Sequence, residues 1–60
     1  MDKFEFKDKL MNIYKTIIQL QGDLYEKSLS DEELAKVRSE IYTALENVND
    51  CVKREIYNIH

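Results

Sequence analysis

Leu29-Ser30-Asp31-Glu32-Glu33-Leu34 is the stretch that decides the fold, because it contains the signals that start a helix. Ser30 can accept a hydrogen bond from the backbone amide of Glu33, and the Glu33 side chain can reach back to the amide of Ser30, as in a capping box. Leu29 and Leu34 are spaced for the hydrophobic staple that accompanies this cap. The three acidic residues add negative charge at the positive end of the helix dipole. The stretch therefore predicts a helix that begins near residue 31.

Downstream of this start, apolar residues recur at steps of three and four, which is the pattern of an amphipathic helix. The pattern repeats every eleven residues, which favours straight or slightly right-handed packing. Two small residues, Ala44 and Cys51, lie beside the stripe and would allow a partner helix to approach closely. We expect this helix to cover about residues 31–58. Its apolar stripe comprises Leu34, Val37, Ile41, Leu45, Val48, Val52, Ile56 and Ile59.

Upstream of the turn, a second helix is predicted over about residues 3–27, with Asp2 as its cap. Its heptad seam comprises Phe6, Leu10, Ile13, Ile17, Leu20 and Leu24, and a second apolar column beside the seam comprises Phe4, Met11, Ile18 and Tyr25. Gly22 could end this helix as a left-handed cap or lie inside it at a cost of about 1 kcal/mol relative to alanine. Because both apolar columns continue past Gly22, we favour a continuous helix.

These elements predict an all-α fold, an antiparallel two-helix hairpin that forms one domain over residues 1–60. The turn would cover about residues 28–30, and so short a connection forces neighbouring helices to run antiparallel. The chain contains no proline and one glycine, whereas several strands joined by tight turns would need more of both.

A two-helix hairpin is a single layer, and its apolar columns are wider than one neighbouring helix can cover. Soluble monomers rarely leave such a strip exposed. We therefore expect a homodimer in which two hairpins form an antiparallel four-helix bundle. A complex with a different protein is the main alternative, and a higher oligomer is the third. The predicted dimer core comprises Phe4, Leu10, Met11, Ile17, Ile18, Tyr25, Leu34, Ile41, Ala44, Val48, Cys51 and Val52.

The residues that usually carry chemistry are scarce in this chain. One cysteine and one histidine are too few for a four-ligand zinc site or an internal disulfide. His60 is the terminal residue, and Cys51 is expected to behave as a small hydrophobic side chain. No Glu-x-x-His motif, glycine-rich phosphate loop or EF-hand loop is present. We therefore predict a protein that is not an enzyme and that uses no cofactor and no metal.

The composition predicts instead a module that binds another protein. Tyrosine is enriched at interface hot spots because it combines a large apolar body with a polar tip. Short, acidic, cofactor-free chains of this kind are frequent among bacterial regulators and phage-encoded inhibitors, so we expect a regulator or inhibitor that acts on an unidentified protein partner. The candidate partner surface comprises Lys3, Lys7, Tyr14, Lys15, Tyr42 and Tyr57.

Nucleic-acid binding is the alternative function. Lysines interleave with Phe4, Phe6 and Tyr14 in the first helix, and in length and layout the chain resembles the Rop family of dimerising hairpins that bind paired RNA loops. The resemblance implies an RNA site on the lysine-bearing face of the first helix. The formal net charge of −3 argues against such binding, since phosphate contacts supply most of its affinity.

Two further features concern location. No apolar run approaches the ~20 residues of a membrane-spanning helix, so no membrane contact is expected. A single cysteine and the lack of a secretory signal favour the cytoplasm.

The stretch Leu29-Ser30-Asp31-Glu32-Glu33-Leu34-Ala35 is similar to one in small nucleoid-protein co-regulators. These seven residues are a common helix start, and no role is transferred from the similarity.

Overall fold

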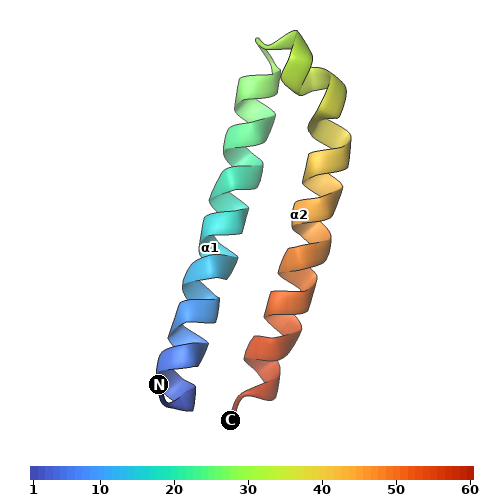
Figure 1. The fold of residues 1–60 in the computed structure, drawn as a ribbon. Helices are drawn as coiled ribbons and strands as arrows, with labels where there is room; N and C mark the ends of the chain where they lie inside the picture. Colours follow the sequence, from blue (N-terminus) through green and yellow to red (C-terminus); the bar gives the residue numbers. More distant parts are fainter.

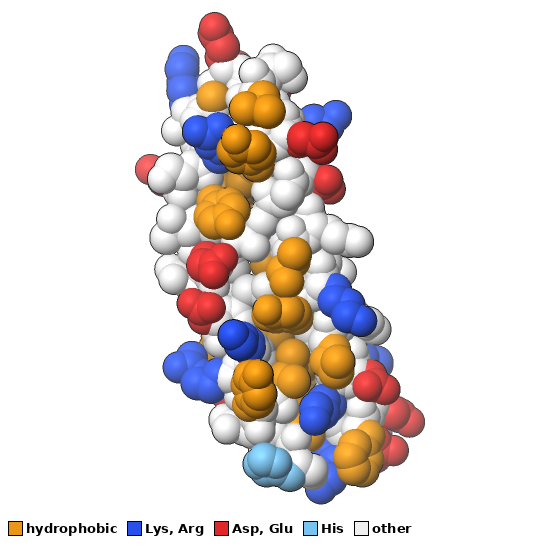
Figure 2. Space-filling model, turned by 180° about the vertical axis from the view of Figure 1, so that it is seen from behind, with side chains coloured by type: hydrophobic (Ala, Val, Ile, Leu, Met, Phe, Trp, Pro, Cys, Tyr) orange, Lys and Arg blue, Asp and Glu red, His pale blue; other side chains and the backbone are white.

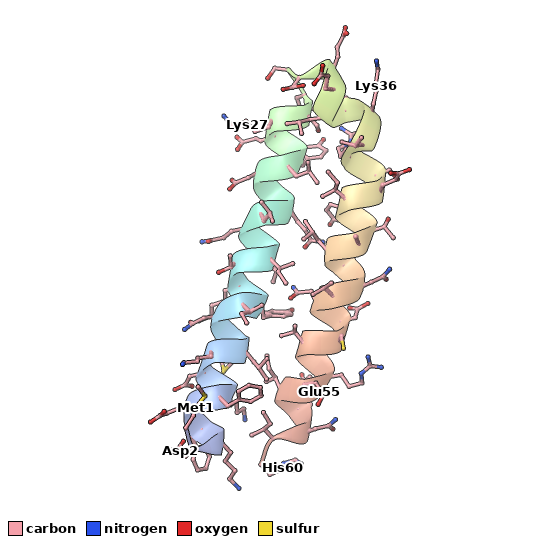
Figure 3. The ribbon with its side chains drawn as sticks, in the orientation of Figure 1. Met1, Asp2, Lys27, Lys36, Glu55 and His60 are labelled. Carbon is pink, nitrogen blue, oxygen red and sulfur yellow. The ribbon has the colours of Figure 1, made fainter.

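The computed structural model describes residues 1–60 as two α-helices, α1 (Lys3–Ser28) and α2 (Glu32–Asn58). They run antiparallel and lie side by side along their whole length (Figure 1). The two termini therefore lie at the same end of the molecule, where Figure 3 labels Asp2 and His60. The predicted all-α helical hairpin is confirmed.

Each helix begins at an aspartate. Asp2 Oδ1 accepts hydrogen bonds from the amides of Phe4 and Glu5, both at 2.9 Å. Asp31 Oδ1 accepts from Glu33 at 3.0 Å and from Leu34 at 3.1 Å. The prediction that Ser30 caps the second helix is therefore wrong by one residue. The Ser30 hydroxyl donates instead to the Lys27 carbonyl oxygen at 3.5 Å, which places Ser30 in the turn.

The turn consists of residues 29–31, and α1 continues through Gly22 to Ser28. Gly22 lies inside α1, and it does not have the positive φ of a left-handed helix cap. The helix ends with the amides of Leu29 and Ser30 bonded to the carbonyl oxygens of Glu26 and Lys27, both at 3.2 Å. The predicted continuation of the helix through Gly22 is thus what the structure has.

The side of α1 that faces α2 combines apolar and polar residues. The junction, by which we mean the contact between α1 and α2, is rotated around α1 relative to the predicted seam. As a result, Phe6, Ile13 and Leu20 are 49%, 47% and 48% exposed. On α2 the shift likewise leaves Val37, Ile41 and Val48 exposed. The α1 residues turned toward α2 recur at steps of three and four; they are Lys7, Leu10, Tyr14, Ile17, Gln21, Leu24 and Ser28.

The molecule is a rod that measures 44 × 15 × 14 Å. Its radius of gyration is 14.0 Å, whereas a compact domain of this length would have one of about 10 Å. A rod of two helices has no enclosed interior, and no side chain is fully buried. The fold therefore places most apolar side chains on its two broad sides.

Candidate interaction surfaces

Four polar contacts link the two helices along the junction. Gln21 Nε2 donates to Glu46 Oε2 at 2.9 Å, and Asn49 Nδ2 donates to the Tyr14 carbonyl oxygen at 3.3 Å. At the two ends of the rod, an Arg38 guanidinium nitrogen donates to Ser28 Oγ at 3.1 Å, and Lys7 Nζ donates to the Ile59 carbonyl oxygen at 3.4 Å. Three of the five buried residues are polar, namely Gln21, Ser28 and Asn49. The hairpin is therefore joined as much by hydrogen bonds as by apolar contact.

The apolar part of the junction is small. Ile17 at 9% exposure and Leu24 at 8% are the only buried hydrophobic residues. At about 1.5–3 kcal/mol for each fully buried aliphatic side chain, two such residues contribute little against the entropy cost of ordering 60 residues. The hairpin thus leaves most of its hydrophobic residues available for other contacts.

One broad side of the rod is lined by apolar residues from both helices. On α2, a rotation of about 100° per residue places Val37, Ala44 and Val48 on the same flank of the junction. Phe6, Ile13 and Leu20, spaced by seven residues, line the facing flank of α1. We call this surface the apolar face; it comprises Phe6, Ile13, Leu20, Val37, Ile41, Ala44, Val48 and Cys51.

The opposite broad side is aromatic and charged. Because α-helices are right-handed, this side lies behind the plane of Figure 1 and is the one that Figure 2 shows, with hydrophobic side chains interrupted by Lys, Arg, Asp and Glu. Tyr57 is 71% exposed here, and the Arg38 guanidinium carbon lies 5.7 Å from the centroid of the Tyr25 ring. We call this surface the tyrosine face; it comprises Phe4, Met11, Ile18, Tyr25, Tyr42 and Tyr57.

Two hollows open on the tyrosine face. The first has a volume of about 280 Å³ and lies near the end of the rod that carries the termini. Its lining residues are Met11, Tyr14, Lys15, Lys53, Ile56 and Tyr57. The second hollow, nearer the turn, is lined by Ile18, Gln21, Gly22, Tyr25 and Tyr42. The first hollow is smaller than the ~300–1,000 Å³ typical of small-molecule sites.

The residues of the predicted dimer core occupy three different surfaces in the structure. Leu10, Ile17, Leu34 and Val52 lie in the junction between α1 and α2. The other eight divide between the two broad sides. The tyrosine face holds Phe4, Met11, Ile18 and Tyr25, whereas the apolar face holds Ile41, Ala44, Val48 and Cys51.

The residues of the predicted partner surface lie mainly on one side. Tyr14, Lys15 and Tyr57 line the first hollow, and Tyr42 lines the second. Lys7 bonds to the backbone of Ile59, the residue that caps the end of α2, and Lys3 Nζ lies 5.4 Å from the centroid of the Phe4 ring. The structure thus brings together four of the six residues that the sequence singled out.

Sequence reasoning missed the polar residues of the junction and the place of Lys53 beside the first hollow. An apolar pattern alone does not reveal polar residues between two helices. The sequence does contain a signal for these residues. Lys7, Tyr14, Gln21 and Ser28 are spaced by seven, which matches one column of a heptad. A polar column at this spacing beside an apolar one indicates a junction held by specific hydrogen bonds.

The structure contains no group of three or more His, Cys, Asp or Glu side chains placed to hold a metal ion. Cys51 is a free, exposed thiol. Neither α1 nor α2 has an apolar stretch long enough to span a bilayer.

Searches against protein-family models, curated proteins and solved structures find no match to this chain.

Proposed function

We propose that this chain is a small non-enzymatic protein-binding module, a regulator or inhibitor of bacterial or phage type, that works as a homodimer. One observation carries the proposal: the hairpin exposes two opposite faces of different chemistry and has almost no core of its own. One face is suited to a second copy of the chain and the other to a different protein.

The exposed surface supports a second copy. The hairpin exposes 4898 Å², whereas a compact monomer of its 7.2 kDa would expose about 4,100 Å². The excess of about 800 Å² equals the area that each partner buries in a standard protein interface. A chain of this size without disulfide or metal also needs an additional source of stability, and burial against a second copy would provide it.

The chemistry of the two faces suggests which one pairs. Homodimer interfaces resemble a divided core and are depleted in charge, which suits the eight residues of the apolar face. Interfaces with other proteins combine tyrosine, methionine and arginine with polar groups, which suits the tyrosine face. We therefore assign the apolar face to the dimer and the tyrosine face to the partner.

We further propose that the protein works in the cytoplasm. Cys51 is exposed and unpaired on the apolar face. An accessible single thiol persists as such in a reducing compartment, whereas an oxidising one promotes disulfides between chains.

Light scattering with a matched pair of variants tests the assembly. We expect the native chain to have about twice its 7.2 kDa mass at micromolar concentration. Val48→Glu places a charge in the apolar face and should halve the measured mass, whereas Asn47→Glu, on the solvent side of the same turn, should leave it unchanged. A native chain that stays monomeric and helical at every concentration would refute the homodimer.

The reactivity of Cys51 gives a second, independent measurement. The thiol is exposed in the single hairpin and would be covered in the dimer. Alkylation should therefore slow as protein concentration rises, and Val48→Glu should restore fast alkylation. A rate that does not depend on concentration, in a sample that scatters as a dimer, would show that the chains pair through another surface.

A further inference from the structure

The α1 residues that line the two hollows of the tyrosine face are seven positions apart in the sequence. Met11, Tyr14 and Lys15 line the first, and the residues seven positions later, Ile18, Gln21 and Gly22, line the second. Seven residues of α-helix span about 10.5 Å. Apolar side chains at positions i and i+7 of an incoming helix have the same separation, which is the usual spacing of anchors in a helix bound in a groove.

The charged residues that line the first hollow are both basic. Lys15 and Lys53 line the first hollow, and no acidic residue does. Arg38 lies against Tyr25, which lines the second hollow. The nearby carboxylate of Glu46 already accepts a hydrogen bond from Gln21. An occupant with carboxylates along its flanks would match these charges.

Gly22 is also better explained by an occupant from outside than by the hairpin. It lies inside a long helix, where glycine is less favourable than alanine, yet no atom lies within 4 Å of the place that a Cβ would occupy. The packing of α1 against α2 therefore does not require a glycine. Its missing side chain instead leaves the second hollow open to the close approach of another backbone.

We propose that the tyrosine face binds one acidic amphipathic α-helix of a partner protein. Two large apolar side chains of that helix, seven residues apart, enter the two hollows, and its Asp and Glu side chains meet Lys15 and Lys53. The proposal rests on the protein-binding function proposed above and specifies the chemistry of the partner.

A helical peptide library provides the test, with the full-length protein as bait. Two positions seven residues apart and their flanks are randomised on a soluble helical scaffold. We expect enrichment of large apolar residues at both anchor positions and of Asp or Glu beside them. A synthetic peptide with the enriched sequence should bind, as measured by fluorescence anisotropy.

Three variants locate the site of that peptide. Lys15→Glu combined with Lys53→Glu should weaken binding at least tenfold, and a peptide with Lys in place of its acidic residues should restore it. Tyr57→Ala should also weaken binding about tenfold. The matched control, Lys27→Glu with Lys36→Glu, makes the same charge change at the turn end of the rod and should alter binding less than twofold (Figure 3).

Gly22→Ala separates binding from stability, because it should raise the melting temperature and yet weaken peptide binding. The proposal is overturned if the library yields no acidic motif with i and i+7 anchors, or if the Lys15/Lys53 variant binds the peptide as well as the native chain. It is also overturned if a duplex RNA probe binds through these lysines and no peptide does. Val48→Glu changes the opposite face, so failure of the dimer and failure of this site can be told apart.

Discussion

Asn49 and Tyr14 are joined across the helix junction by a hydrogen bond of 3.3 Å from Asn49 Nδ2 to the Tyr14 carbonyl oxygen. Asn49 is only 5% exposed, and its Oδ1 is buried without any hydrogen-bond partner. An unsatisfied buried oxygen costs about 1–3 kcal/mol, which offsets the gain from the bond that the amide makes. The residue therefore contributes more to the alignment of the helices than to their stability, as buried asparagines do in coiled coils.

Replacing this amide should stabilise the hairpin. Asn49→Leu removes the unsatisfied oxygen and adds apolar contact in the junction, so we expect the free energy of unfolding to rise by about 1 kcal/mol. Urea unfolding followed by circular dichroism at several protein concentrations measures the change. Asn47→Leu, an exposed site two residues away, is the control and should change stability little. A loss of stability for Asn49→Leu alone would mean that the amide has a partner that this structure does not contain.

The second polar link between the helices is the bond of Gln21 to Glu46, at 2.9 Å. Gln21 is buried, whereas Glu46 is exposed, so solvent weakens the interaction. A double-mutant cycle of Gln21→Ala and Glu46→Ala should give a coupling energy of about 0.5–1 kcal/mol. A cycle that pairs Gln21→Ala with Glu40→Ala, on the outer side of α2, should give a coupling near zero. Equal couplings in the two cycles would contradict a direct bond.

The cap of α2 offers a comparison between adjacent residues. Asp31→Ala removes the acceptor for two backbone amides and should cost about 1 kcal/mol of stability. Ser30→Ala should be almost neutral, because the Ser30 hydroxyl bonds weakly within the turn. Thermal unfolding of both variants measures the difference. A larger loss of stability for Ser30→Ala than for Asp31→Ala would support the capping box that the sequence predicted.

Gly22→Ala is expected to stabilise the free protein. Alanine is favoured over glycine inside a helix by about 1 kcal/mol, and the added Cβ meets no atom within 4 Å. For a domain this small, the melting temperature should rise by about 4–8 °C. Differential scanning calorimetry checks this value. A fall in melting temperature, together with a lower mass in light scattering, would indicate that a second copy of the chain covers Gly22 in the proposed dimer.

The main features of the fold could be predicted from local patterns. Apolar residues at steps of three and four identify both helices, and the columns that continue past Gly22 show that the first helix is unbroken. The predicted cap of α2 is one residue before the observed cap. Ser30 and Asp31 are both good capping residues, and backbone geometry decides between them. The polar junction was missed because Gln21 and Asn49 become favourable there only when the facing helix supplies their partners.

The sequence by itself determined that two long amphipathic helices form and that a short turn makes them antiparallel, since helix periodicity and turn length are local properties of the chain. Only the tertiary structure decided which side of each helix meets the other. That choice depends on fitting two surfaces together, and here polar groups such as Gln21 and Asn49 take the centre of the junction. As a result, Phe6, Ile13 and Leu20 became part of an exposed face instead of a seam, and Met11 and Ile18 were placed with Tyr57 and Tyr42 around the two hollows.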